Sequence, residues 1–217
     1  MSQFIRAAVA ACAIVVGLSF AVANELATAD EDPNTASIGA NSIQVELVTS
    51  EGNIVLELDA KNAPKSTQNF LSYTKNGHYD GTVFHRVIDG FMVQGGGLDT
   101  TLKEKPTQPP VVNESNNGLK NTKYSVAMAR VGSDPHSATS QFFINIADNN
   151  FLNREESSDG FGYAVFGRVV EGQEVVDQIG KTPTRTQPNP AFPPQLMQNV
   201  PVDPIVLKSA RVLVKKK

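Results

Sequence analysis

The residues of this chain that are best suited to chemistry lie in one stretch, residues 84–97, with the sequence FHRVIDGFMVQGGG. Arg86 stands there within an otherwise apolar pair of segments, and the following residues include Phe91, Met92 and Gln94. A guanidinium is a permanent cation with several hydrogen-bond donors, so Arg86 could hold a polar group of a bound molecule. Apolar walls with few polar groups are typical of small-ligand or peptide sites. The alternative is an arginine that packs its stem on the surface and pairs with a carboxylate.

A second block, residues 140–144 (SQFFI), has a similar composition, because Gln141 provides one amide beside two aromatic side chains. Each block alone is more often part of an ordinary core. Together they indicate an apolar pocket with a small number of amide groups.

Other kinds of active site find little support in the sequence. His78, His85 and His136 show neither H-x-x-x-H nor cysteine-paired spacing, so we expect no metal site and no cofactor. The three glycines at residues 95–97 are not followed by Lys-Ser or Lys-Thr, so they predict a bend or bulge rather than a phosphate-binding loop. No G-x-S-x-G motif is present, although the sequence leaves a Ser/His/Asp combination open.

The segments that must position these side chains are mainly short strands. Residues 43–49 and 53–59 alternate apolar and polar side chains around a turn at residues 50–52, and they predict a β-hairpin. Residues 63–77 predict a helix, because Pro64 suits its first position and an Asn-Gly pair suits its end. Further strands are predicted at residues 83–88, 91–94, 124–129, 142–146, 163–170 and 205–214, a second helix at residues 173–179 and a long loop at residues 99–122.

About eight strands and two helices, without regular β-α-β alternation, predict a mainly β fold. They favour a closed β-barrel or a sandwich over a doubly wound sheet. Residues 183–204 hold seven prolines in 22 residues, which excludes a helix and a central strand there. Strict alternation would put Met92 and Gln94 on one face of a strand and Phe91 on the other. The chain must therefore bend near Gly90 if all three are to line one site.

Composition indicates an ordinary globular chain. The 217 residues are 40% hydrophobic and carry a net charge of −3, from 19 basic and 22 acidic residues. Without an excess of positive charge, we expect no nucleic acid partner. Residues 24–41 are small, polar and acidic and predict a flexible leader, so the folded domain is expected at residues 42–217.

Residues 1–23 predict a secretory signal peptide. Arg6 precedes an apolar run at residues 7–20, and the Ala-Val-Ala of residues 21–23 suits the cleavage site. The apolar run is short for crossing a bilayer, and cleavage would remove it. We therefore expect no stable membrane association after cleavage. Cleavage would also remove Cys12, the only cysteine, and leave a chain suited to an oxidising compartment such as the periplasm. Two alternatives are a buried N-terminal helix and lipidation of Cys12.

Four stretches together resemble the cyclophilins, a family of peptidyl-prolyl cis-trans isomerases, and most of all its secreted bacterial branch. The resemblance covers residues 42–214, and its most specific parts are the motifs F-H-R-x-I-x-x-F-M-x-Q-G-G and S-Q-F-F-I. It implies a closed eight-stranded antiparallel β-barrel capped by two α-helices, with the substrate site on the outer face of the barrel. The four stretches are residues 83–97, 116–130, 137–152 and 163–169.

The resemblance also implies roles for individual residues. The catalytic arginine of the family falls on Arg86. The amide that holds the substrate backbone falls on Gln94, with Gln141 nearby. The proline pocket falls on Phe91, Met92, Phe143 and Leu152, and backbone contacts fall on Ala129 and Arg130.

Three positions of the expected substrate site depart from the best-known eukaryotic pattern. Phe151 replaces a tryptophan, Tyr163 replaces a histidine, and Arg130 replaces an asparagine. Because phenylalanine lacks the indole N–H donor, we expect weak binding of cyclosporin-like cyclic peptides, while isomerisation should be retained.

The expected function is the isomerisation of X-Pro bonds in exported, folding polypeptides. Arg86 would donate a hydrogen bond to the prolyl nitrogen within an apolar groove, and proline-containing polypeptides would be the partners of a monomeric enzyme. A second hypothesis is a binding module that holds proline-containing segments with little turnover. A third, a hydrolase, has no supporting motif.

Overall fold

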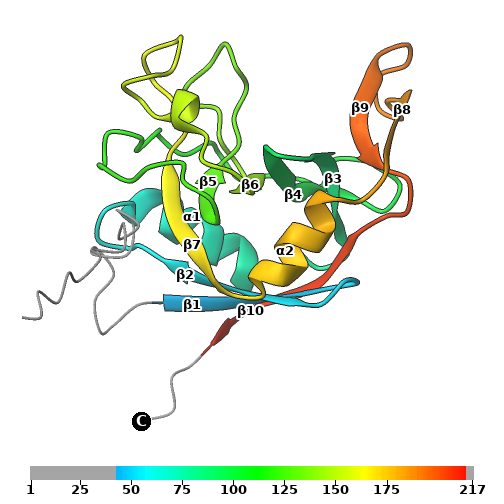
Figure 1. Ribbon diagram of the computed structural model, residues 1–217, viewed down its shortest axis with the longest axis horizontal. Helices are drawn as coiled ribbons and strands as arrows, with labels where there is room; N and C mark the ends of the chain where they lie inside the picture. The colour runs from blue at the N-terminus through cyan, green and yellow to red at the C-terminus, as the bar shows by residue number, and fades with distance from the viewer. Residues whose placement is uncertain (1–42, 214–217) are drawn as a thin grey trace, which may run out of the picture. The chain divides into compact units, whose positions relative to one another are not determined.

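The structure is a computed structural model and describes residues 43–213. This part of the chain forms ten β-strands, two α-helices and one 3-10 turn (Figure 1). The predicted signal peptide and leader, residues 1–23 and 24–41, lie outside the described residues. The strands are β1 (Ile43–Thr49), β2 (Asn53–Leu58), β3 (Thr82–Ile88), β4 (Met92–Asp99), β5 (Ser125–Met128), β6 (Phe142–Asn145), β7 (Val165–Glu171), β8 (Thr184–Pro188), β9 (Leu196–Pro201) and β10 (Val206–Leu213). The helices are α1 (Pro64–Lys75) and α2 (Gln173–Gly180), and the 3-10 turn is η1 (Asn150–Leu152).

Eight of the ten strands in the described residues close into one barrel, which confirms the predicted fold. Their order is β1-β10-β3-β4-β6-β5-β7-β2, and neighbouring strands pair antiparallel. The predicted hairpin of β1 and β2 is confirmed, with Val45 opposite Leu56. Because β1 also pairs with β10, the first and last strands of the domain lie side by side and close the sheet.

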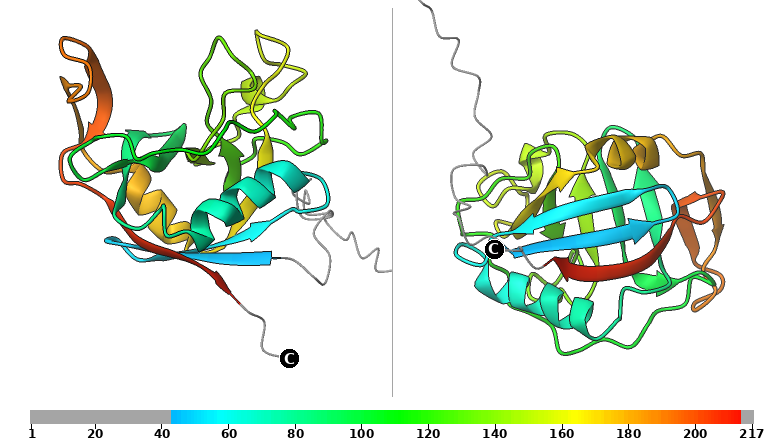
Figure 2. Two further views of the ribbon diagram at one scale, coloured as in Figure 1. Left: turned by 180° about the vertical axis from the view of Figure 1, so that it is seen from behind. Right: turned by 90° about the horizontal axis from the view of Figure 1, so that it is seen from below.

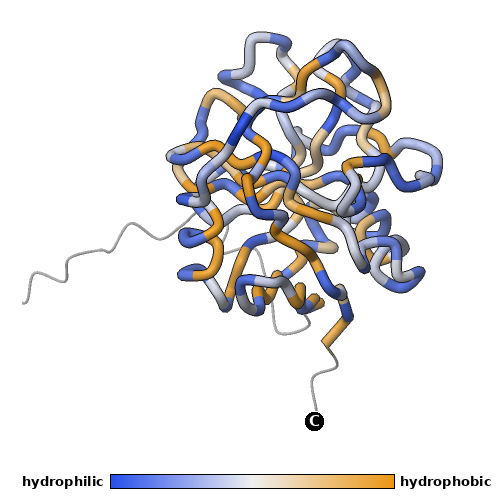
Figure 3. Tube along the Cα trace, turned by 90° about the vertical axis from the view of Figure 1, so that its right-hand side faces the viewer, coloured by the Kyte–Doolittle hydropathy of each residue, from blue (hydrophilic) through white to orange (hydrophobic). Residues whose placement is uncertain are grey.

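The two helices cover opposite openings of the barrel (Figure 2). α1 begins at Pro64, as predicted, and buries Phe70 and Tyr73 in the barrel core. α2 buries Val176 and Ile179 in the same core. Hydrophobic residues gather in the middle of the molecule, whereas the outlying loops are mostly hydrophilic (Figure 3). Neither helix of the described part of the chain is long and apolar enough to span a bilayer.

Strands β5 and β6 are buried on both faces. Phe142 and Ile144 belong to the large core inside the barrel, whereas Phe143 and Ala127 belong to a second, smaller hydrophobic cluster. This division follows from the alternation of side chains along a strand. The second cluster also contains Met92, so it covers the outer face of the barrel at β4, β5 and β6. An apolar surface outside the barrel is therefore built into the sheet.

The proline-rich segment contains strands that the sequence did not predict. β8 and β9 form a separate two-stranded antiparallel sheet, with Gln187 opposite Met197, and it rises away from the barrel (Figure 1). We call residues 184–201 the arm. Pro188 and Pro201 stand at the strand ends, where a missing N–H removes little pairing. The proline content excludes a central strand, as predicted, but it permits these two edge strands.

His85 of β3 lies where the arm meets the barrel. It lines a cavity of about 90 Å³ together with Val200 and Pro201 of the arm, and the residue is only 7% exposed. Burial lowers the pKa of His85 to about 4; the charge of Arg86 acts in the same direction, and the backbone of Val83 acts against it. His85 is therefore neutral in the folded protein at neutral pH.

We predict that His85 makes the fold sensitive to acid. Between pH 6.5 and about pH 4 the unfolded chain binds a proton here that the folded chain does not bind, so the free energy of unfolding falls as the pH falls. The expected contribution between pH 7 and pH 4.5 is about 2–3 kcal/mol. Urea denaturation at pH 7 and pH 4.5 measures the free energy of unfolding. Its decrease between the two pH values should be smaller by this amount in His85→Leu than in the wild type.

The exposed His136 provides the matched control for this measurement. His136→Leu should lose as much stability on acidification as the wild type does. If His85→Leu also shows the wild-type loss, the buried histidine is not a source of the acid sensitivity.

Candidate active site

Three side chains from neighbouring strands form a row on the outer face of the barrel. Arg86 of β3 lies opposite Gln94 of β4, and Gln94 lies opposite Phe143 of β6. Opposite residues of antiparallel strands share a face and have Cβ atoms about 4.5–5.5 Å apart. Strand pairing alone therefore brings the guanidinium, the amide and the phenyl ring together.

A turn before β4 brings Phe91 to the same place. Gly90 has a φ of +67°, in the left-handed region that glycine adopts without steric cost. The N–H of Phe91 donates to the carbonyl of Ile88 at 3.1 Å, and β4 begins only at Met92. Phe91 thus belongs to the turn and is free of strand alternation. The bend that the sequence required near Gly90 is confirmed.

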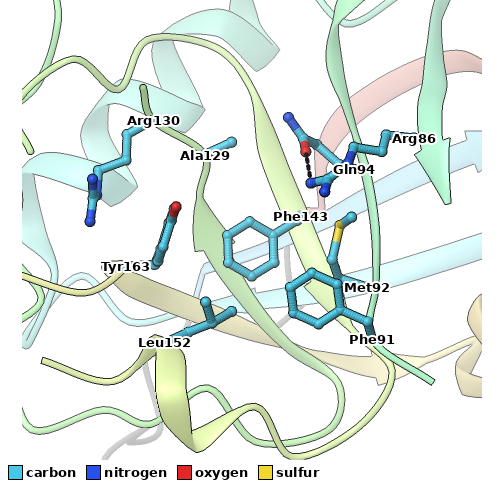
Figure 4. Close-up of a pocket in the computed structure, with 9 residues that line it drawn as sticks. All are labelled: Arg86, Phe91, Met92, Gln94, Ala129, Arg130, Phe143, Leu152 and Tyr163. Carbon is cyan, nitrogen blue, oxygen red and sulfur yellow. Dashed lines mark hydrogen bonds between the residues drawn. The ribbon is translucent and has the colours of Figure 1, made fainter. Parts of the chain in front are cut away.

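The row and the turn contribute to one pocket of about 100 Å³ (Figure 4). This space suits one small side chain, since sites for drug-sized molecules enclose about 300–1,000 Å³. Among the described residues, no three His, Cys, Asp or Glu side chains lie close enough to hold a metal ion. Nine of the eleven residues expected at the site line this pocket: Arg86, Phe91, Met92, Gln94, Ala129, Arg130, Phe143, Leu152 and Tyr163.

The two other expected residues lie beside the pocket. Gln141 Oε1 accepts a hydrogen bond from Gln94 Nε2 at 3.0 Å, so the two amides are held together. Phe151 is 56% exposed and stacks on Phe91, with ring centroids 5.6 Å apart. Gln141 and Phe151 therefore stand at the rim of the site rather than in its walls.

The glycine run of β4 lets Gln141 approach the strand closely. A side chain at Gly97 would collide with the side chain of Gln141. The pairing of β3 with β4 is irregular on both sides of Phe84, as expected of a bulge. The predicted bulge is confirmed, and the missing side chain at Gly97 leaves room for Gln141.

Arg130, one of two arginines that line the pocket, is neutralised. Its guanidinium forms an ion pair with Asp159 and donates to the carbonyl oxygens of Gly132 and Gly162, each at 3.1 Å. It also lies 4.4 Å from the ring centre of Tyr163. Burial would raise the pKa of Asp159, but hydrogen bonds from backbone N–H groups, a serine hydroxyl and Arg130 hold it well below its usual range. Arg130 is thus a fixed part of the wall.

Arg86 is in a different electrostatic state. Within residues 43–213, no carboxylate forms an ion pair with it. Its Nη1 donates to Gln94 Oε1 at 3.4 Å, which is long for a hydrogen bond. The alternative of an arginine paired with a carboxylate is therefore wrong, and the guanidinium can donate to a bound molecule.

A network of buried asparagines behind the pocket was missed from the sequence. Asn149 Nδ2 donates to the carbonyl of Phe91 at 2.8 Å and to Asn145 Oδ1 at 2.7 Å. Asn145 Nδ2 donates in turn to Ser125 Oγ at 2.8 Å. The network ties the turn at Phe91 to the start of η1, which carries Leu152. Its one sequence signal was an asparagine within an apolar predicted strand.

An eight-stranded barrel covered by two helices, with an arginine beside an apolar pocket on its outer face, is the architecture that the sequence resemblance implied for an isomerase. Residues 44–212 match the family described as cyclophilin type peptidyl-prolyl cis-trans isomerase/CLD. The chain therefore belongs to the cyclophilin-type peptidyl-prolyl cis-trans isomerases. It is an enzyme that isomerises the peptide bond before proline, and its substrates are proline-containing peptides.

Bacterial relatives match most of the chain. Peptidyl-prolyl cis-trans isomerase cyp18 of Streptomyces antibioticus is 54% identical over 170 residues, which cover 78% of this chain and 98% of the relative. Peptidyl-prolyl cis-trans isomerase A of Dickeya dadantii is 51% identical over 180 residues, or 83% and 90% of the two chains. Peptidyl-prolyl cis-trans isomerase B of Escherichia coli is 47% identical over 165 residues, or 76% and 96%.

Solved structures share the fold. A crystal structure of a cyclophilin type isomerase of Cryptosporidium parvum has a TM-score of 0.67 and 26% identity, and it covers 81% of this chain and 99% of its own. A second crystal structure of that isomerase, in the presence of the dipeptide Ala-Pro, has a TM-score of 0.65, also at 26% identity, with 79% and 99% coverage.

We predict that Asn149→Ala weakens the site from behind. The substitution removes the side-chain donor to the Phe91 carbonyl and to Asn145 Oδ1, so the free energy of unfolding should fall by about 1–3 kcal/mol. Because Phe91 loses part of its support, the KM for a short proline peptide should rise more than kcat falls. Urea denaturation and isomerase kinetics measure the two effects.

Asn150→Ala is the matched control, since Asn150 is the next residue and its side chain is exposed. It should leave stability and KM near the wild-type values. Equal effects of the two substitutions would show that the network does not support the site.

Proposed function

We propose that Arg86 accelerates isomerisation by donating a hydrogen bond to the prolyl nitrogen in the transition state. The peptide bond before proline resists rotation with a barrier of about 18–20 kcal/mol, because the nitrogen shares its lone pair with the carbonyl. In the twisted transition state this lone pair returns to the nitrogen, which then becomes a good acceptor. A fixed donor at that atom stabilises the transition state more than either planar ground state.

The observation that carries this proposal is the unneutralised charge of Arg86 beside an apolar pocket. Asp159 occupies the guanidinium of Arg130, whereas Arg86 contacts only the neutral amide of Gln94 among the hydrogen bonds described above. The long bond to that amide is easily exchanged for one to a substrate. In a site shielded from water, a charge-assisted hydrogen bond is stronger than in solution.

The apolar walls would hold the proline ring while the preceding carbonyl swings. Met92 and Phe143 are buried, at 2% and 4% exposure, so they are packed in place before substrate arrives. A rate gain of about 10⁵ requires about 7 kcal/mol. One charge-assisted hydrogen bond supplies about 1.5–3 kcal/mol, so positioning and desolvation in the pocket must supply the rest.

The amide pair would hold the substrate backbone. Gln94 receives a bond from Arg86 at its oxygen and donates one to Gln141 from its nitrogen, so its orientation is defined. Ala129 and Arg130, which follow directly after β5, would offer backbone groups to the same chain. The remaining contacts are proposed for the walls and rim, at Phe91, Phe151, Leu152 and Tyr163.

We predict that Arg86→Ala lowers kcat/KM by about 10- to 150-fold, which corresponds to the loss of one charge-assisted hydrogen bond. The loss should fall on kcat more than on KM, because the bond forms mainly in the transition state. Arg86→Lys should recover only part of the rate, since an ammonium lacks the planar fork of donors. NMR exchange spectroscopy on a short Ala-Pro peptide gives these rates.

Arg211→Ala is the control for the removal of an arginine. Arg211 lies on β10 and forms an ion pair with Glu46 of β1 at 2.7 Å. It belongs neither to the pocket residues nor to the rim residues. It should keep the wild-type rate. If Arg86→Ala also keeps that rate, or raises KM with kcat unchanged, then the arginine does not act in the transition state.

We further propose that the enzyme acts on exported, folding polypeptides in the periplasm. The support lies in the sequence, where a charge, an apolar run and an Ala-x-Ala site occupy residues 1–23. The chain that follows this segment has no cysteine, which suits an oxidising compartment. We expect the monomer to be active, because the fold of a single chain already brings together nine of the eleven expected site residues.

We predict that the full chain, expressed in a Gram-negative host, is recovered from the periplasm with Asn24 as its first residue. Cell fractionation and intact mass spectrometry test both points. Deletion of residues 1–23 should retain the protein in the cytoplasm with unchanged kcat/KM, because the nine residues described as lining the pocket all lie between Arg86 and Tyr163. An N-terminus at a lipid-modified Cys12, or an uncleaved chain, would contradict the proposed processing.

A further inference from the structure

The arm stands on the side of the barrel that carries the pocket. In Figure 1 the arm and the loops around η1 rise on the same side of the barrel. β9 of the arm packs against β3, the strand that carries Arg86. The arm is thus attached next to the catalytic strand.

A line of cavities in the described residues joins the catalytic pocket to the arm. The pocket shares Gln94, Ala129 and Arg130 with a neighbouring cavity of about 230 Å³. That cavity shares Glu104 and Gln141 with a third one of about 170 Å³, which the arm closes. Because a side chain that lines two cavities borders both, the three cavities lie in a row, and we call this row the groove.

We call the third cavity the arm pocket. Its lining is mixed, because polar side chains stand among the apolar ones: His85, Glu104, Gln141 and Asn189. Phe192 and Met197 line it from the arm, and Leu98 and Leu102 line it from the barrel side. Phe192 is 57% exposed, which leaves much of an aromatic ring for a binding partner to cover. Methionine adapts its shape to different side chains, so this pocket suits a class of large apolar groups.

Only one face of the arm looks onto this groove. Met197 lines the arm pocket, whereas its neighbour Leu196 does not, and successive side chains of a strand point to opposite faces. Leu196 is 62% exposed. Strand β9 therefore carries one apolar side chain, Met197, over the groove and a comparable one, Leu196, away from it.

We propose that the arm pocket is a subsite for a large apolar side chain of the polypeptide substrate, away from the proline that is isomerised. The inference rests on the proposed seat of that proline beside Arg86. The occupant is the substrate chain itself, because the arm pocket lies in the same row of cavities as the pocket beside Arg86, where that chain would be held. Substrates with phenylalanine, leucine or methionine at the matching distance are the preferred ones.

Such a subsite acts on binding and not on the chemical step. A side chain far from the rotating bond is held equally in the ground state and in the transition state. It therefore lowers KM and leaves kcat unchanged. A peptide of three or four residues is too short to gain from it.

Methionine methyl groups report on the two ends of the groove separately. The chain has four methionines, of which Met92 lines the catalytic pocket, Met197 lines the arm pocket and Met128 is buried in the barrel core. ¹³C-methyl-methionine spectra are recorded with a short Ala-Pro peptide and with longer peptides. The longer peptides place one phenylalanine two to six residues before or after the proline, in steps of about 3.3 Å. Serine replaces the phenylalanine in the controls.

The short peptide and the serine peptides should shift the Met92 signal alone, and at least one phenylalanine peptide should shift Met92 and Met197 together. For that peptide, Phe192→Ala and Met197→Ala should each raise KM by about 5- to 20-fold with kcat unchanged. Both variants should isomerise the short peptide at the wild-type rate. Leu196→Ala should change neither value.

The proposal is overturned if no phenylalanine peptide shifts Met197, or if Leu196→Ala raises KM as much as the groove-facing substitutions do. It is also overturned if the arm variants slow the short and long peptides equally, because the arm would then act through the fold. A Met92 signal that no peptide moves would instead show that the proposed seat of the proline is wrong, and the subsite would fail with it.

Discussion

The proposed mechanism depends on one constraint: a cationic side chain must stay unneutralised beside an apolar pocket. A charge in such a place usually attracts a carboxylate, as Arg130 attracts Asp159. Arg86 differs because its neighbours across the sheet are an amide and a phenyl ring, which strand pairing places beside it. A slip of one residue would turn Gln94 and Phe143 to the other face, so the closed barrel that holds the register also keeps this guanidinium available.

The apolar walls exist because β5 and β6 bury both of their faces. Phe142 fills the barrel core, while Phe143 next to it forms part of the pocket. A turn and several loop residues must then cover the outer face, and their buried polar groups need partners. The side chains of Asn145 and Asn149 supply them, and each unpaired group would cost about 1–3 kcal/mol. The apolar surface of the pocket therefore requires a polar network behind it, which satisfies the buried polar groups of the covering segments.

Local features could be predicted from the sequence because each depends on neighbouring residues. The hairpin at residues 43–59, the start of α1 at Pro64 and the bend at Gly90 are of this kind. The pocket is not, since Arg86 and Tyr163 meet only through the order of the strands, and the family resemblance rather than spacing placed them together. The asparagine network and the arm were missed for physical reasons. A buried amide cannot be told from a loop amide before its partners are known, and proline excludes central strands without excluding strand ends.

A pocket that accepts one proline ring cannot choose among polypeptides, because every X-Pro bond presents the same ring. Choice must come from contacts elsewhere along the chain, and each methylene buried there is worth about 1–3 kcal/mol. Contacts that bind the ground state and the transition state equally leave the barrier to rotation of the prolyl peptide bond unchanged. The arm meets this requirement because it is a separate sheet packed on β3, and its tip residues take no part in the barrel register. In the proposed arrangement Gln141, which lines both the arm pocket and the neighbouring cavity, is the side chain that lies between substrate selection at the arm and the proposed chemistry at Arg86.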